Sequence, residues 1–248
     1  MSSIKQNWKK YALIVVLIFM AIVGGILLHR RHEANYLKQL NEKMIYHPPT
    51  TEEEPSEPEM AVDFTYLASE NPDINSWITI PDTKISYPIL QSGEDKKEDY
   101  YLHHNVDGSY GYPGVIYMQK DNSAEYSDRV TVLYGHNMRD GSMFAGLHKY
   151  ADSKYFEKHP DIDVYTPSGT KHYKVFAALQ YDDRHILDAY GYFKTTEAVQ
   201  AFYEECGSLA DNITYLGHLD EDTKLLVLST CEKESDKRYL VVAALEAE

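Results

Sequence analysis

The stretch LLVLSTCEKESDKRYLVVAALE, residues 225–246, decides the fold, because it holds two apolar runs separated by a polar, charged gap. Runs rich in Val and Leu that are bounded by polar residues are typical of buried strands. The first run ends at Cys231, and Arg238 opens the second. The stretch therefore predicts two neighbouring strands that carry a cysteine and an arginine at their ends.

Outward from this stretch, residues 61–248 predict further short strands joined by brief turns. Strands are expected at Trp77–Ile80, around Val115–Met118 and in DRVTVLYGHNM up to Tyr134, and two more flank the turn in VYTPSGTKHY. Pro88 lies in another run of this kind, and a proline indicates that its strand is at the edge of a sheet. The region therefore predicts about eight strands in succession.

Two segments between these strands carry apolar residues at helical spacing. GSMFAGLHKYAD predicts a short helix, and TTEAVQAFYEECGSLA predicts a longer one at residues 195–209, opened by a capping threonine. Strands that follow one another directly, rather than alternating with helices, favour antiparallel architectures. The chain is therefore predicted to be mainly β (α+β), a closed or nearly closed barrel with peripheral helices.

The N-terminal region reads differently from the rest. Residues 11–28, YALIVVLIFMAIVGGILL, contain no charge and span ~27 Å as a helix, which matches the hydrocarbon thickness of a bilayer. A cleaved signal peptide is the rival interpretation, but the charged HRRHE follows directly and disfavours cleavage. Residues 47–60, HPPTTEEEPSEPEM, are rich in proline and glutamate and predict an extended, solvated stalk.

The composition excludes several classes of function. A net charge of −15 argues against nucleic acid as a partner, because phosphate binding requires a basic surface. Two cysteines, Cys206 and Cys231, are too few for a disulfide framework, and no C-x-x-C pair indicates zinc. His103, His104 and His136 lack a recognisable metal-ligand spacing, so neither a metal nor a cofactor is expected.

Three chemically useful residues stand at strand ends: Cys231, Arg238, and His136 in YGHN directly after VTVLY. A thiolate attacks acyl carbons, an imidazolium stabilises it and protonates a departing amine, and a guanidinium stabilises an oxyanion. If a barrel brings all three to one rim, they predict acyl transfer through a thioacyl-enzyme. The alternatives are a cysteine that is only a small buried hydrophobe, a histidine in an ordinary turn and a solvated arginine.

The motifs VLYGHNM, GSMFAGLHKY and VLSTC, with the arginine before YLVVAAL, resemble the sortases, cysteine transpeptidases of Gram-positive bacterial surfaces. The resemblance covers about residues 64–248, and the motifs occur in the family's order. Class B is most similar, because of the YGHNM…GSMFAGL run and the helix at 195–209. The Asp-Pro-aromatic lid motif of class C does not occur in the sequence. The resemblance implies an eight-stranded sortase β-barrel with N-terminal helices and an inserted helix before the nucleophile strand.

The resemblance also assigns roles. It makes Cys231 the nucleophile, His136 the general acid/base and Arg238 the clamp for the oxyanion and substrate. It implies cleavage of a C-terminal sorting motif of the Asn-Pro-x-Thr type after Thr, followed by transfer of the acyl group from a thioester to an amine of the cell-wall cross-bridge. Residues expected to line the substrate groove are Tyr134, Ser229, Thr230, Glu232, Leu102 and Ile186.

The same resemblance implies a location. Residues 1–10 become a short cytoplasmic tail, 11–28 a single-pass transmembrane anchor in the cell membrane, 29–60 a polar, acidic stalk, and 61–248 an extracellular catalytic domain. The partners are then surface proteins bearing a C-terminal sorting signal and a cell-wall precursor amine. Cys206 is expected to be a packing residue. Three alternatives remain: a non-catalytic peptide-binding module, a hydrolase that uses water, and a pilus-assembling sortase that uses a protein lysine as acceptor.

Overall fold

The computed structural model describes residues 2–46, 61–111, 113–217, 219–231 and 236–246. The chain forms two compact units, Met1–Lys43 and Met44–Glu248. Of the predicted stalk at 29–60, residues 47–60 lie outside the described residues, and the boundaries of tail, anchor and stalk remain predictions.

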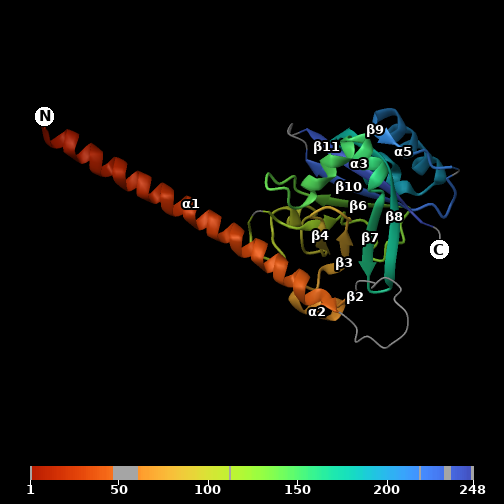
Figure 1. The fold of residues 1–248 in the computed structure, drawn as a ribbon, viewed down its shortest axis with the longest axis horizontal. Coiled ribbons are helices and arrows are strands. Elements are labelled where there is room, and N and C mark those ends of the chain that lie inside the picture. Colours follow the sequence, from red (N-terminus) through yellow and green to blue (C-terminus); the bar gives the residue numbers. More distant parts are fainter. Residues whose placement is uncertain (1, 47–60, 112, 218, 232–235, 247–248) are drawn as a thin grey trace. The chain divides into compact units, whose positions relative to one another are not determined.

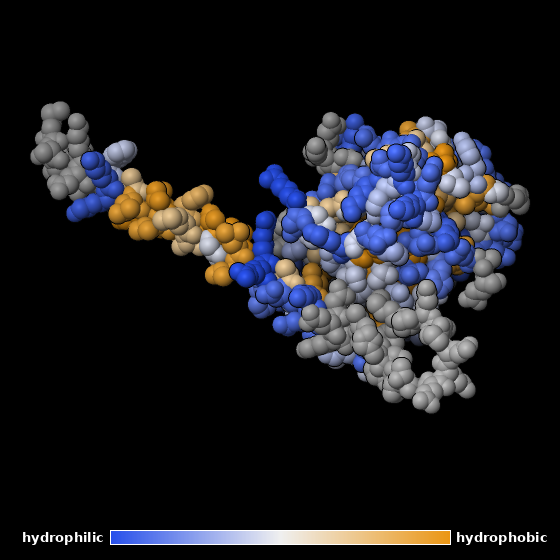
Figure 2. All heavy atoms as spheres, in the orientation of Figure 1, coloured by the Kyte–Doolittle hydropathy of each residue, from blue (hydrophilic) through white to orange (hydrophobic). Residues whose placement is uncertain are grey.

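The first unit is helical and consists of most of α1 (Ser2–Met44). Its segment Trp8–Gln39 is long and apolar enough to cross a membrane and overlaps the predicted anchor. The large apolar side chains along this segment are exposed, and Figure 2 shows them gathered in the middle of the helix with polar residues on both flanks. A helix that is apolar on all sides suits a lipid environment.

The second unit is a β-barrel (Figure 1). In the described part of the chain, eight strands follow one another in the order β11-β10-β6-β5-β4-β3-β7-β8, and β8 pairs back with β11 to close the sheet. The short strand β9 pairs with Ala177–Leu179 of β8, beyond the part of β8 that pairs with β7. The predicted eight-stranded barrel is thus confirmed. The strands are β3 (Ile74–Thr79), β4 (Ser86–Gln91), β5 (Ile116–Met118), β6 (Val130–Gly135), β7 (Asp161–Thr166), β8 (Gly169–Asp182), β9 (Ala210–Ile213), β10 (Leu225–Cys231) and β11 (Lys237–Leu245).

Short helices connect these strands. They are α2 (Phe64–Glu70), η1 (Tyr100–Leu102), η2 (Phe144–Ala151), α3 (Ser153–Lys158), α4 (Ile186–Ala189), η3 (Gly191–Phe193) and α5 (Thr196–Leu209), and a two-stranded ladder joins β1 (Ile45–Tyr46) to β2 (Ala61–Val62). The inserted α5 occurs where it was predicted, and the Thr195 hydroxyl accepts the Ala198 N–H at its start. Phe202 and Cys206 of α5 belong to the core that also contains Val227 of β10.

The short helix predicted in GSMFAGLHKYAD is present as a 3₁₀-helix, η2. The reason is visible in its buried side chains, Phe144, Leu147 and Tyr150, which recur every three residues. A spacing of three matches the period of the 3₁₀-helix and keeps one narrow face against the barrel. The sequence pattern therefore predicted the helix but not its 3₁₀ type.

The expectation that Pro88 marks an edge strand is wrong. Its strand, β4, pairs antiparallel with β3, where Pro88 faces Trp77, and parallel with β5 on the other side. The pairing with β5 begins only at Ile89. Because Pro88 lies just outside that ladder, its missing N–H interrupts no bond to β5, and the proline is tolerated inside the sheet.

β10 is the central strand of the region that matters for function. It pairs in parallel with β6 and antiparallel with β11. Residues 225–230 are buried and only Cys231, at the end, is half-buried. A strand with neighbours on both edges and both faces covered reads as a continuous apolar run, which explains why LLVLST lacks alternation. Its polar last residue therefore emerges at the rim of the barrel.

Candidate active site

The ends of β10 and β11 bring two of the predicted residues together. Cys231 and Arg238 are direct partners in the antiparallel register. Residues paired in this way have Cβ atoms about 4.5–5.5 Å apart and point to the same face. Both side chains line one cleft, of about 170 Å³. The charged link of residues 232–235, which contains the predicted Glu232, lies outside the described residues.

The third predicted residue, His136, directly follows the end of β6. The register pairs Gly135 with Thr230, and the Thr230 hydroxyl donates to the Gly135 carbonyl at 2.8 Å. A side chain at Gly135 would press into the ring of Phe144, its Cβ only 2.8 Å from that ring. The absence of a side chain there lets the histidine segment lie close against η2. His136 therefore starts beside Cys231, at the same end of the barrel.

Asn137 fastens this segment to the end of β10. Its amide donates to the carbonyl of Cys231 at 3.0 Å and to Nε2 of His148 at 2.8 Å. Asn137 was not predicted as a site residue. Its one sequence signal is that it directly follows His136 in YGHN. The bond to the Cys231 carbonyl fixes the spacing between the histidine segment and the cysteine.

The imidazole of His136 is held from one side by Leu102. Nε2 donates to the Leu102 carbonyl at 2.8 Å, so in the neutral ring Nδ1 is the acceptor nitrogen. Burial lowers the pKa of His136, the bond to Leu102 opposes this shift, and the nearby His103 adds to it. The ring is therefore neutral near pH 7. Gly114, at φ +67°, makes room for the carbonyl: a Cβ there would lie 2.6 Å from the Leu102 oxygen.

Leu102 is itself anchored through its neighbour Tyr101. The Tyr101 hydroxyl donates to the Asp73 carboxylate at 2.5 Å, and Lys96 forms an ion pair with the same carboxylate. Asn71 also donates to the Tyr101 hydroxyl, at 3.3 Å. Burial raises the pKa of Tyr101 to about 12, so the hydroxyl keeps its proton for this bond. The hydrogen bonds of Tyr101 therefore hold in place the Leu102 carbonyl that orients His136.

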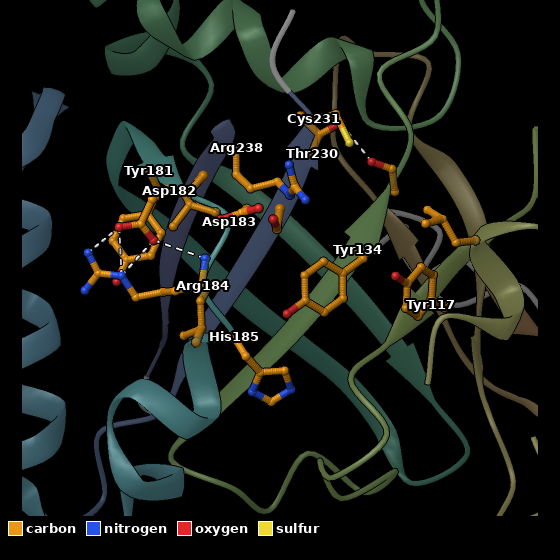
Figure 3. A pocket seen from close by; sticks show the side chains of 15 residues that line it. Tyr117, Tyr134, Tyr181, Asp182, Asp183, Arg184, His185, Thr230, Cys231 and Arg238 are labelled. Carbon is orange, nitrogen blue, oxygen red and sulfur yellow. Dashed lines mark hydrogen bonds and ion pairs between the residues drawn. The ribbon is translucent and has the colours of Figure 1, made fainter. Parts of the chain in front are cut away.

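The cleft extends from Cys231 along the inside of the rim (Figure 3). The rings of Tyr117 and Tyr134 stack with centroids 5.3 Å apart and form one wall. Burial raises the pKa of both tyrosines, so they remain neutral hydroxyls. Five of the six residues predicted to line the substrate groove lie along this cleft, and the sixth, Glu232, lies outside the described residues. The five are Leu102, Tyr134, Ile186, Ser229 and Thr230.

The opposite wall, residues 181–186, was largely missed by the sequence analysis. Arg184 forms an ion pair with Asp182, stacks over the ring of Tyr181 at 4.9 Å, and reaches Glu205 of α5 at 3.3 Å. The hydroxyl of Tyr190 also donates to Glu205. The inserted helix α5 therefore holds this wall in place. A charged stretch such as DDRH gives no local signal that distant helix residues will fix it.

His185 lies at the far end of the cleft from Cys231 (Figure 3). Its Nδ1 accepts the N–H of Asp188 at 3.1 Å and caps α4, while Nε2 lies 3.0 Å from Glu98 and 2.6 Å from the amide nitrogen of Gln119. Both ring nitrogens are thus engaged in structure. His185 closes the cleft and holds α4, and with it Ile186, against the rest of the barrel.

The two cysteines have different environments. Cys206 is fully buried in α5, and burial together with Glu205 raises the pKa of its thiol, which makes it unreactive. Cys231 is half-buried and opens onto the cleft. Both are free thiols. Within the described residues, no group of three or more His, Cys, Asp or Glu side chains is arranged to hold a metal ion.

Comparison with known proteins agrees with this geometry. A family model described as a sortase domain matches residues 78–246. The chain is 37% identical over 173 residues to Sortase B of Listeria monocytogenes, across 68% of this chain and 67% of that relative. Sortase B from B. anthracis, solved in complex with AAEK1, has a TM-score of 0.71 at 27% identity and covers 90% of this chain and 100% of its own. A Staphylococcus aureus sortase B–substrate complex has a TM-score of 0.65 at 28% identity, covering 74% and 84%.

Proposed function

The chain belongs to the sortase family of cysteine transpeptidases and resembles its class B, and from that premise we propose that Cys231, His136 and Arg238 carry out the transfer. The observation that supports this most is the arrangement at the rim. Cys231 and Arg238 are register partners, and the residue after His136 is bonded to the Cys231 carbonyl. The cleft that begins at this point then binds the acyl donor.

The first half of the proposed reaction forms a thioester. The sorting peptide lies in the cleft with its scissile carbonyl at Cys231, whose thiol proton passes to Nδ1 of His136. The thiolate attacks the carbonyl carbon, and Arg238 stabilises the resulting oxyanion. His136 then donates the proton to the departing amine as the C–N bond breaks. The acyl group remains on sulfur.

The second half reverses these steps with a new amine. The amine nitrogen attacks the thioester carbonyl while His136 takes a proton from it, a C–N bond forms, and Cys231 departs as a thiolate that recovers its proton. We propose that the donor is a surface protein with an Asn-Pro-x-Thr-type sorting motif cut after Thr, and that the acceptor is an amine of the cell-wall cross-bridge. A similar S. aureus sortase B was solved with a substrate, which supports peptide binding in this cleft.

The proposal is tested with a fluorescent peptide that contains an Asn-Pro-x-Thr motif, incubated with triglycine. We expect a product in which the acyl fragment ending in Thr is joined to triglycine. If the fragment ending in a free Thr carboxylate is the sole product, the enzyme is a hydrolase. An intact peptide that binds without cleavage would indicate the binding module. A lysine-bearing peptide used in preference to triglycine would favour the pilus-assembling alternative.

The pH profile of kcat/KM is expected to be bell-shaped, with an acid limb below pH 6.5. Burial lowers the pKa of His136, so the ring stays neutral to a lower pH than an ordinary histidine. The active form holds one proton on the Cys231–His136 pair, so the rate falls both when the pair gains a second proton and when it loses that one. The profile is measured by initial rates between pH 4.5 and 10. An acid limb well above pH 6.5 would contradict the assigned environment of His136.

We also propose a location, supported by the apolar segment of α1. Residues 1–10 form a cytoplasmic tail, residues 11–28 a single-pass anchor in the cell membrane, 29–60 a stalk, and 61–248 the catalytic domain on the outer face. This orientation is the one that gives the enzyme access to cell-wall amines. Protease treatment of intact cells should then digest the catalytic domain, which a cytoplasmic domain would resist.

A further inference from the structure

Residues 103–111 form a hairpin next to the proposed acid/base. His103 directly follows Leu102, whose carbonyl accepts the His136 hydrogen bond. Backbone bonds close the hairpin: Gly111 donates to His103 at 2.9 Å, and His104 and Tyr110 form an antiparallel bridge. The position of the hairpin is therefore fixed relative to the imidazole of His136.

The hairpin presents a supported aromatic ring to solvent. Tyr100 and His104 stack at 3.7 Å, and Nδ1 of His104 donates to the Tyr100 carbonyl at 2.7 Å. Tyr110 packs edge-on to His104 at 5.4 Å and lies 6.5 Å from the His103 ring. Despite this support Tyr110 is 78% exposed, so it adds little to the core. A large ring held in place but left in water suits contact with a ligand.

The reaction itself requires a second entry to Cys231. The acyl part of the donor occupies the cleft, and the lining of that cleft does not include the hairpin. The nitrogen that leaves and the nitrogen that enters must both reach His136, because it gives the proton in one half-reaction and takes it in the other. The hairpin adjoins His136 through Leu102 without being part of the donor cleft, so it borders this second approach.

The charge of this surface fits an amine. Asp107, in the turn of the hairpin, has an exposed side chain. A primary amine is mainly an ammonium ion at neutral pH, and an ammonium is attracted both by carboxylates and by the face of a tyrosine ring.

We infer that the hairpin 103–111 is the acceptor site and that Tyr110 contacts the ammonium of the incoming acceptor, an inference that rests on the proposed transpeptidase function. The amine loses its proton to solvent, and its neutral nitrogen attacks the thioester carbonyl. The C–N bond forms, the C–S bond breaks, and Cys231 leaves as a thiolate. The second proton of the nitrogen passes to His136 and then to the thiolate, which restores the resting pair.

The test measures how the acyl-enzyme divides between triglycine and water. The ratio of ligated to hydrolysed product is followed against triglycine concentration, so the result does not depend on how fast the acyl-enzyme forms. Tyr110→Ala should raise the half-saturating triglycine concentration about two- to fivefold, and Tyr110→Lys should raise it further. Tyr110→Phe keeps the aromatic ring and should therefore keep the wild-type value. Tyr215→Ala is the matched control, because Tyr215 has a similar exposure on a different segment. It should leave the half-saturating triglycine concentration unchanged.

Two outcomes overturn the inference. One is a half-saturating triglycine concentration that is the same in Tyr110→Ala and in the wild type. The other is an equal fold-change for hydroxylamine, a small neutral nucleophile that needs no ammonium site, because this would indicate a general disturbance of His136. A mass spectrum of the wild type without an acyl adduct on Cys231 would refute the proposed function instead, so the two failures are distinguishable.

Discussion

Cys231→Ala is expected to lower transpeptidation by at least about 10⁴-fold and to abolish covalent capture of a sorting-peptide mimic. An alanine cannot form the thioester, so only background reaction remains. The peptide should still bind, because the stacked Tyr117–Tyr134 wall and Ile186 are untouched by this change. The expected signature is therefore a lost rate with retained affinity.

The measurement is intact-protein mass spectrometry after incubation with a chloromethyl-ketone peptide ending in threonine. Wild type should gain one adduct and Cys231→Ala none. Cys206→Ala is the matched control, because burial raises the pKa of the Cys206 thiol and keeps it unreactive. It should gain the adduct as wild type does. An adduct that persists in Cys231→Ala, or disappears in Cys206→Ala, would show that Cys231 is not the nucleophile.

The part of the site that was easiest to predict is the part encoded locally. Cys231 ends one apolar run and Arg238 begins the next after a short link, so an antiparallel pairing of the two runs places these residues opposite each other. The resemblance to the sortases then supplied the barrel and the order of its motifs. Closure of the barrel by β8 and β11 agrees with that expectation.

The position of His136 depends on long-range pairing. It reaches the rim because β6 runs parallel to β10 in a register that pairs Gly135 with Thr230. No local pattern reveals a parallel pairing between segments about a hundred residues apart, since each strand reads only as an apolar run. The motif resemblance, not the spacing, therefore carried the prediction that His136 lies near Cys231.

The features that were missed arise from side-chain bonds between distant segments. Arg184 holds the cleft wall through Glu205, and Asn137 holds the histidine segment through the Cys231 carbonyl. Each residue is an ordinary polar surface residue by type. Such roles depend on geometry to within a few tenths of an ångström, which propensity and periodicity do not encode.

Arg238→Lys is expected to lower kcat/KM by about 10²- to 10³-fold, the range seen when one donor to an oxyanion is removed. The substitution keeps the positive charge, so the loss isolates the geometry of the guanidinium. Arg238 donates from Nη1 to the carbonyl of Lys237 at 3.0 Å, and this bond helps to fix the plane of the guanidinium. A lysine ammonium is a point charge and does not reproduce a planar fork.

The change should fall on kcat more than on KM, because the interaction strengthens as charge develops on the oxygen. Arg129→Lys is the matched control. Arg129 lies at the opposite end of β6 from His136, where its Nη1 donates to Thr196, so the same substitution in the same sheet should alter the rate less than twofold. If Arg238→Lys retains wild-type kcat, the oxyanion is stabilised by other donors at the rim. An equal loss in both variants would mean that a disturbed sheet, rather than a lost donor, limits the reaction.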